Sequence, residues 1–143
     1  MKKIILISVL CMVTLAGMNY PHKTIAIARE MPAEPYLRIA NAIAMVETGI
    51  NDSAYNPKEK AYGRYQIRKP MLKQYVKETG IHYTLNNCFD KKISNRIFMW
   101  HATKYRPDQI SKISRCWNGG KQGDKKRSTI AYYQKVFAEL KEK

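Results

Sequence analysis

The segment from Tyr36 to Glu47 constrains the fold most strongly, because its apolar residues recur at the spacing of an α-helix. At about 100° per residue, such a helix carries Tyr36, Ala40 and Ile43 along one face. Glu47 falls on the same face, so one carboxylate lies on the side that should pack against the core. Gly49 stands where helices commonly end in a left-handed turn. Glu47 is therefore predicted to occupy the last turn of a partly buried helix.

This predicted environment should raise the pKa of Glu47. Burial removes water from the carboxylate and the negative end of the helix lies close to it, and both effects disfavour the charged form. A carboxyl group that stays protonated near neutral pH is what a general acid requires. A lone glutamate at a helix end is more often a solvated surface residue. The functional interpretation gains support from residues 61–67, where a glycine and a glutamine stand in an apolar-aromatic run that would return beside Glu47.

Four further helices are predicted after a turn-rich loop over residues 51–60. Pro35 fits the first turn of the Glu47 helix, and the later helices are expected from Lys69-Pro70 to Gly80, from an Asp90 cap to about Tyr105, from an Asp108 cap to residues 118–120, and from Ser128 onward. The last helix is expected to bury Ile130, Tyr133, Phe137 and Leu140. Trp100 is interpreted as a core residue rather than a sugar-stacking one. These patterns predict a mainly helical domain.

Four short motifs occur in order along the chain: ETG at 47–49, GRYQI at 63–67, WNGG at 117–120 and YYQKV at 132–136. In this order they resemble the motifs of the soluble lytic transglycosylase domain, which belongs to the lysozyme-like superfamily. The usual family text is Glu-Ser-Gly, Gly-Leu-Met-Gln-Ile, Ala-Tyr-Asn-x-Gly and Tyr-Val-x-Lys-Val. Each motif alone is weakly specific, but four in the right order over residues 36–140 are fairly specific. The departures from the family text affect the expected groove wall more than the expected reaction.

The resemblance implies a lysozyme-like single domain with about five helices and a short irregular loop or β-hairpin after the catalytic glutamate. It implies that Glu47 is the catalytic acid and base, and that the substrate-binding residues are Thr48, Gly63, Tyr65, Gln66, Asn118 and Tyr132. In this reading Gly63 lets the backbone approach the sugar groove and Tyr65 lines it. A sharp left-handed helix exit explains much of the motif at Asn118 without any sugar.

The resemblance also implies a reaction: cleavage of the MurNAc-β-1,4-GlcNAc bond of peptidoglycan with formation of 1,6-anhydromuramic acid, without a metal or organic cofactor. Hydrolysis by the two-carboxylate routes needs a second acid, and the nearby ones are Asp52 and Glu59 in the loop. A lytic transglycosylase avoids this need, because the C6 hydroxyl of the muramic sugar attacks its own C1. The alternatives are a true muramidase of the same fold and a non-catalytic wall-binding or assembly protein. By analogy, a small single domain suits local wall opening for a secretion or conjugation apparatus.

The N-terminal residues predict export. Residues 1–28 read as a signal peptide or leader with cleavage near residue 16 or 28, followed by the lysozyme-like domain at residues 33–143. The apolar run at 4–18 is shorter than the ~20 residues of a spanning helix, although an uncleaved anchor stays an alternative. We therefore expect a periplasmic or extracellular protein and a monomer.

The net charge of +15 favours polyanionic partners. In an exported protein these are peptidoglycan glycan strands, anionic wall polymers or a membrane surface. The positive charges are spread along the whole chain, which does not indicate a specific nucleic-acid site.

Cys88 and Cys116 are the two cysteines that would remain after export. In an oxidising compartment their default state is one disulfide, worth roughly 3–4 kcal/mol if the geometry permits. Zinc is a weaker alternative with His82 and His101, because the sequence lacks the paired spacings of a zinc site.

Overall fold

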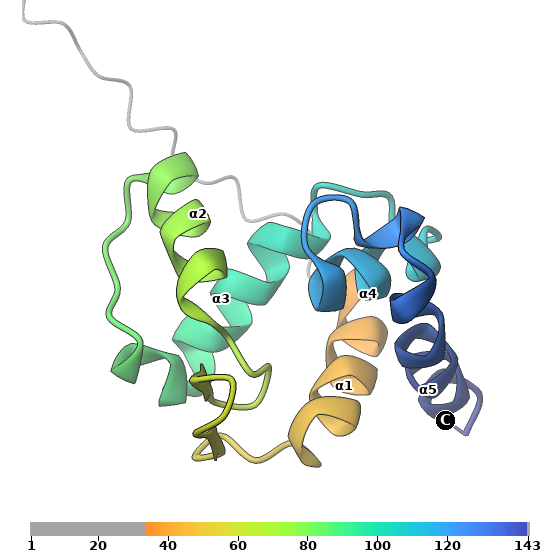
Figure 1. The fold of residues 1–143 in the computed structure, drawn as a ribbon, viewed down its shortest axis with the longest axis horizontal. Helices are drawn as coiled ribbons and strands as arrows, with labels where there is room; N and C mark the ends of the chain where they lie inside the picture. Colours follow the sequence, from red (N-terminus) through yellow and green to blue (C-terminus); the bar gives the residue numbers. More distant parts are fainter. Residues whose placement is uncertain (1–33, 143) are drawn as a thin grey trace, which may run out of the picture.

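A computed structural model describes residues 34–142 (Figure 1). The elements are α1 (Glu34–Thr48), β1 (Tyr55–Asn56), β2 (Ala61–Tyr62), α2 (Lys69–Thr79), α3 (Lys91–Ala102), α4 (Ile110–Gly119) and α5 (Ile130–Lys141), with short 3₁₀ turns at Asn86–Phe89, Gly123–Lys125 and Arg127–Thr129. The prediction of a mainly helical domain with a hairpin after Glu47 is confirmed. The leader predicted at 1–28 lies outside the described residues. Among residues 34–142, no helix combines the length and hydropathy that a membrane span requires.

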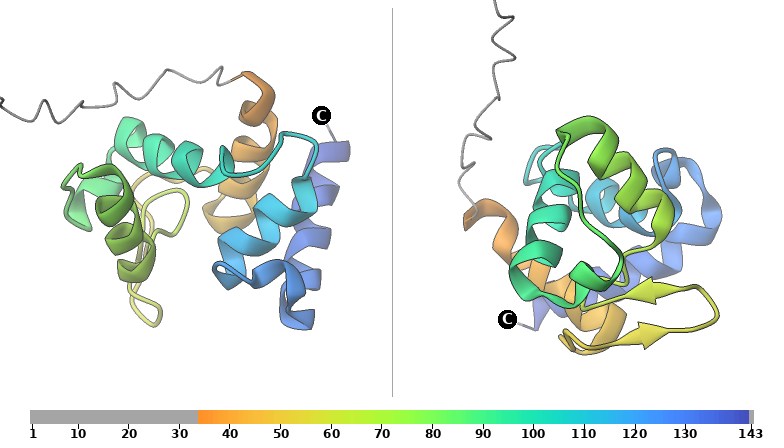
Figure 2. Two further views of the ribbon diagram at one scale, coloured as in Figure 1. Left: turned by 90° about the horizontal axis from the view of Figure 1, so that it is seen from above. Right: turned by 90° about the vertical axis from the view of Figure 1, so that its left-hand side faces the viewer.

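The helix α3 links two parts of the molecule. It packs against α2 on one side and against α1 and α4 on the other, while α1 and α5 lie side by side (Figure 1). The antiparallel hairpin pairs Tyr55 with Tyr62 and lies beside the C-terminal end of α1 (Figure 2). A further bridge from Tyr62 to Ile67 continues the hairpin into the segment before α2. The residues that follow Glu47 therefore return close to the end of its helix.

Several predicted helix limits are confirmed. Lys69 and Pro70 open α2, and Gly80 ends it in the left-handed region at φ 72°. Asp90 is the N-cap of α3, because its carboxylate accepts from the backbone N–H groups of Lys92 at 2.8 Å and Ile93 at 3.0 Å. Local side-chain chemistry sets these ends, which is why the sequence alone located them.

Two other limits were wrong. α3 ends at Ala102 rather than near Tyr105, since the N–H of Tyr105 bonds the Ala102 carbonyl at 3.0 Å in a tighter turn. Asp108 does not cap α4; its carboxylate pairs with Arg106 at 3.0 Å, and Gln109 occupies the cap position. The carboxylate that the sequence pattern assigned to the helix thus contacts Arg106, two residues before it.

The predicted inner face of α5 is confirmed only in part, because Leu140 packs against the core whereas Ile130 and Phe137 do not. Ile130 and Phe137 are 40% and 38% exposed, whereas Val136 is fully buried. The preceding turn fixes the rotation of the helix, because the Thr129 hydroxyl is buried and lies 2.6 Å from the Gly123 carbonyl. With Thr129 inside, the side of α5 that carries Tyr132 and Val136 turns toward the rest of the domain.

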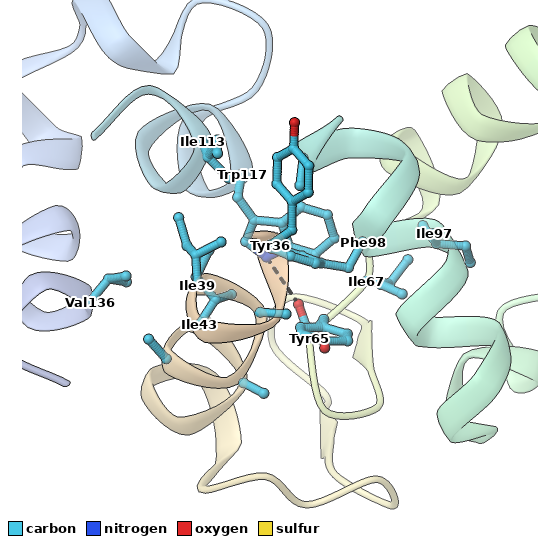
Figure 3. Packing of buried hydrophobic residues seen from close by; sticks show 14 of the residues in the cluster. Tyr36, Ile39, Ile43, Tyr65, Ile67, Ile97, Phe98, Ile113, Trp117 and Val136 are labelled. Carbon is cyan, nitrogen blue, oxygen red and sulfur yellow. Dashed lines mark hydrogen bonds between the residues drawn. The ribbon is translucent and has the colours of Figure 1, made fainter. Parts of the chain in front are cut away.

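Three aromatic rings form the centre of the core (Figure 3). Tyr65 stacks on Phe98 at 4.8 Å between centroids, and Phe98 meets Trp117 edge-on at 5.1 Å. The indole N–H of Trp117 donates to the Tyr65 carbonyl at 3.3 Å, which satisfies its buried donor. Trp100 is partly buried and meets Tyr75 edge-on at 5.3 Å, which confirms that it is a packing residue.

The two cysteines are free thiols, which corrects the expected disulfide. The Cys88 Sγ faces the Thr84 carbonyl at 3.9 Å, and the Cys116 Sγ faces the Lys121 carbonyl at 3.8 Å. Each thiol is thus buried against its own turn. Burial raises the pKa of Cys88 to about 11, so this thiol is neutral.

Candidate active site

Glu47 and Tyr132 meet between the first and last helices. The Tyr132 hydroxyl donates a hydrogen bond of 2.8 Å to Glu47 Oε1, across 85 positions of sequence. Glu47 lies in the last turn of α1 and Tyr132 in the first turn of α5, and packing of these helices brings them together. Both side chains are half-buried. The structure therefore joins the predicted acid to one of its predicted site residues.

The pKa of Glu47 is raised from 4.5 to about 7, as its position in the sequence predicted. The largest cause is burial, which disfavours the carboxylate. The hydrogen bond from Tyr132 and the positive charge of Arg68 lower the pKa of Glu47, but they do not cancel the rise caused by burial. The negative charge of Glu59 raises this pKa further. A pKa of about 7 lets one carboxyl group give up a proton and take one back at neutral pH.

Arg68 is a site residue that the sequence reasoning missed. Its Nη2 donates to the Asn118 carbonyl at 3.2 Å, and its Nη1 faces Glu59 Oε2 at 3.4 Å. Its charge lowers the pKa of both Glu47 and Tyr132. The one sequence signal was its place between the GRYQI motif and the start of α2. A basic residue there reads equally well as a solvated helix start.

Thr48 ties the end of α1 to the GRYQI segment. Its hydroxyl lies 3.1 Å from the Arg64 carbonyl and 3.3 Å from the Ala44 carbonyl, and it accepts from the Asn51 N–H at 3.1 Å. Its side chain is thus engaged by protein groups on several sides. These contacts fix the backbone directly after Glu47, which positions the carboxyl group.

Gly63 does allow a close backbone approach, but to a different part of the protein than expected. A Cβ built on Gly63 would lie 2.0 Å from the Cys88 carbonyl, and its φ is 69°. The neighbour is the 3₁₀ turn before α3, so the expectation that Gly63 faces a sugar groove is corrected. Only glycine combines this left-handed backbone with such a close neighbour.

The expectation that Tyr65 lines the groove is also corrected. Its ring is 1% exposed and stacks in the core, and its hydroxyl donates to Asn95 Oδ1 at 2.8 Å. A buried tyrosine needs such a partner for its hydroxyl. The family motif placed Tyr65 by position, whereas the packing of Phe98 and Trp117 decides where the ring points.

Gln66 and Asn118 are half-buried at the edge of the site. Gln66 has a positive φ of 50°, and its Nε2 donates to the Gly63 carbonyl at 3.1 Å, which closes a tight turn. The Asn118 carbonyl accepts from Arg68. The side-chain amide of Asn118 makes no hydrogen bond to the other residues of the described region, so it can serve a ligand.

The two loop acids have arginine partners. Arg64 forms a two-point ion pair with the carboxylate of Asp52. The Arg64 Nε donates to Asp52 Oδ1, and the Arg64 Nη2 donates to Asp52 Oδ2 at 3.1 Å. Glu59 makes a single, exposed contact with Arg68. Within residues 34–142 there is no group of three His, Cys, Asp or Glu side chains arranged to hold a metal ion.

Two hollows of about 360 and 320 Å³ lie on the described surface, and Glu47 lines neither. The first includes Met71 and Gly120, which stand close in the chain to Arg68 and Asn118. It lies between α2, α3 and α4. Comparison of the chain with protein-family models, curated proteins and solved structures gives no match.

Proposed function

We propose that this protein is a peptidoglycan lytic transglycosylase with a lysozyme-like domain. The observation that carries the proposal is the half-buried Glu47 carboxyl group, with a pKa of about 7, held by the Tyr132 hydroxyl. The ordered resemblance of four motifs supports the same activity, and two of them supply this pair of residues. The short hairpin after Glu47 is consistent with the lysozyme-like fold that we propose.

The proposed reaction uses Glu47 twice. Its protonated form gives a proton to the glycosidic oxygen as the bond to C1 of the muramic sugar breaks, which releases the other strand as an alcohol. The C6 hydroxyl of the same sugar then forms a bond to C1, and ionised Glu47 takes the hydroxyl proton. Glu47 ends protonated, and the product is a 1,6-anhydro sugar. No water, metal or organic cofactor enters this balance.

The surrounding residues have supporting roles in this proposal. Tyr132 orients the carboxyl group and stabilises its ionised form between the two proton transfers. Arg68 adds a positive charge that favours the same form. Thr48 fixes the helix end, and the amide of Asn118 is available to a sugar hydroxyl.

A muramidase is the second candidate. Hydrolysis with two carboxylates needs an acid free to act on C1 or on a water molecule. Asp52 is engaged by both Nε and Nη2 of Arg64, which disfavours that role. Glu59 is exposed and close enough for its charge to raise the pKa of Glu47, so a hydrolase would depend on it.

The cellular setting is part of the proposal. We place the protein in the periplasm or outside the cell, as a monomer that opens wall locally for a secretion or conjugation apparatus. The leader pattern at residues 1–28 supports export, and the net charge of +15 supports contact with anionic wall polymers or membrane. The mature N-terminus of the exported protein, read by mass spectrometry, tests the leader; an unprocessed chain would contradict cleavage.

Mass spectrometry of purified peptidoglycan tests the activity. The wild type should release anhydro-muropeptides, and Glu47→Gln should lose about 10²-fold or more in rate because it cannot transfer a proton. Glu139→Gln is the matched control, a half-buried glutamate on α5 two turns from Tyr132. Reducing-end products would make the protein a hydrolase and turn attention to Glu59. Products that persist in Glu47→Gln, or their absence from the wild type, would overturn the proposal.

A further inference from the structure

Two arginines near the site pair with carboxylates in different ways. The Arg64 side chain is 7% exposed and contacts Asp52 through two nitrogens. The Arg68 side chain is 43% exposed and faces Glu59, itself 58% exposed, through one contact of 3.4 Å. Two-point buried pairs are strong and specific, whereas exposed single-contact pairs contribute little. The Arg68–Glu59 pair can therefore be exchanged for another carboxylate at small cost.

Arg68 nevertheless has a fixed place. Its Nη2 donates to the Asn118 carbonyl at the end of α4, so the guanidinium extends from the start of α2 toward α4. Its charge also lowers the pKa of Glu47 and of Tyr132. A guanidinium has five N–H donors, and these two contacts engage only part of them. Such a group suits recognition of a planar carboxylate.

Peptidoglycan offers one carboxylate that is attached directly to the muramic sugar. The lactyl group on O3 is a neutral amide while a stem peptide is attached, and it becomes a free carboxylate once the peptide has been removed. We propose that Arg68 exchanges Glu59 for this lactyl carboxylate, so that the site selects glycan strands stripped of their stem peptides. This inference rests on the proposed function.

Three soluble substrates of matched length test the selection. The first is glycan stripped of peptide by an amidase, the second is the same glycan with its lactyl carboxylates converted to methylamides, and the third is glycan that keeps its peptides. The rate of anhydro-sugar formation gives kcat/KM on each. Binding to the Glu47→Gln variant gives a Kd that does not depend on cleavage.

The expected result is a preference of about tenfold for carboxylate strands over methylamide strands, as a charge-assisted hydrogen bond provides. Arg68→Gln should remove this preference, and Arg68→Lys should keep part of it. Glu59→Gln should raise the preference several-fold by freeing Arg68. Arg106→Gln is the matched control, since it removes the same charge from another exposed single-contact ion pair and should leave the preference unchanged.

The inference would be overturned by no preference in the wild type, by a preference that survives in Arg68→Gln, or by stronger Arg68-dependent use of peptide-bearing strands. Loss of the preference in Arg106→Gln as well would attribute it to net charge and overturn the role of Arg68. Tighter Arg68-dependent binding of carboxylate strands without any cleavage would refute the proposed activity and support the inference. The two failures are therefore distinguishable.

Discussion

The Tyr132 hydroxyl lies 2.8 Å from Glu47 Oε1 and donates the hydrogen bond that holds the carboxyl group between α1 and α5. Two opposing effects meet at this contact. Burial raises the pKa of Glu47, while the bond from Tyr132 lowers it, and the balance lies at about 7. Burial raises the pKa of Tyr132, and the contact with Glu47 raises it further, because ionising the phenol would place a second negative charge beside the carboxylate. Tyr132 is therefore a neutral donor throughout the physiological range.

Removal of the Tyr132 hydroxyl should raise the pKa of Glu47 further. The hydroxyl stabilises the ionised carboxylate, so Tyr132→Phe leaves burial less opposed and moves the pKa above 7. Carbon-detected NMR titration of the glutamate carboxyls measures this shift directly. Tyr133→Phe is the control, because the neighbouring ring packs against Phe137 and has no contact with Glu47 among the bonds described. A pKa that stays the same or falls in Tyr132→Phe would contradict the assigned role.

Glu47 should make the protein more stable in mild acid. Its pKa is raised in the folded state, so the stabilising contribution is fully present below the unfolded value of 4.5 and is lost as pH rises through about 7. The difference corresponds to roughly 3 kcal/mol at one pKa unit per 1.36 kcal/mol. Urea unfolding from pH 4 to 8 should show the wild type losing this amount relative to Glu47→Gln.

The comparison with the variant is necessary because His101 acts in the opposite direction. Burial lowers the pKa of His101 to about 4, so its contribution is present above 6.5 and is lost as pH falls through about 4. This part is shared by the wild type and Glu47→Gln and cancels in their difference. A difference that is constant with pH would show that Glu47 has an ordinary pKa.

Gly63→Ala should destabilise the domain far more than Gly80→Ala. Both glycines have left-handed backbones, at φ 69° and 72°, which an alanine adopts at a cost of about 1–2 kcal/mol. The added Cβ at Gly63 would also lie 2.0 Å from the Cys88 carbonyl, whereas nothing lies within 4 Å at Gly80. Thermal unfolding of the two variants measures the contrast. Equal losses of stability in the two variants would show that the turn before α3 can move away from the added Cβ without an energetic penalty.

The sequence located Glu47 because local rules decide its position. A helix period that ends at a glycine sets the face and the last turn, and burial of that face raises the pKa. The caps at Asp90 and Gly80 were predicted for the same reason. Tyr132 was predicted as a site residue only from its motif. The apolar pattern of α5 did not include it in the predicted buried face.

Other parts of the site depend on contacts that no local pattern encodes. The rotation of α5 follows from the buried hydroxyl of Thr129, which makes its bonds in the turns before the helix. The inward direction of Tyr65 follows from Phe98 and Trp117, which are distant in sequence. The sequence did not indicate Arg68 as a site residue, because its contact with Asn118 forms only when the start of α2 lies beside the end of α4. Transfer of roles by motif position failed where packing, rather than the motif, orients the side chain.

The position of α5 also has a consequence for the order in which the molecule becomes complete. A chain synthesised from its N-terminus presents α1 before α5, and the carboxyl group of Glu47 lacks its tyrosine partner until α5 docks. A molecule shortened before Tyr132 cannot form this hydrogen bond. The described architecture thus completes the site only once α1 and α5 have packed together.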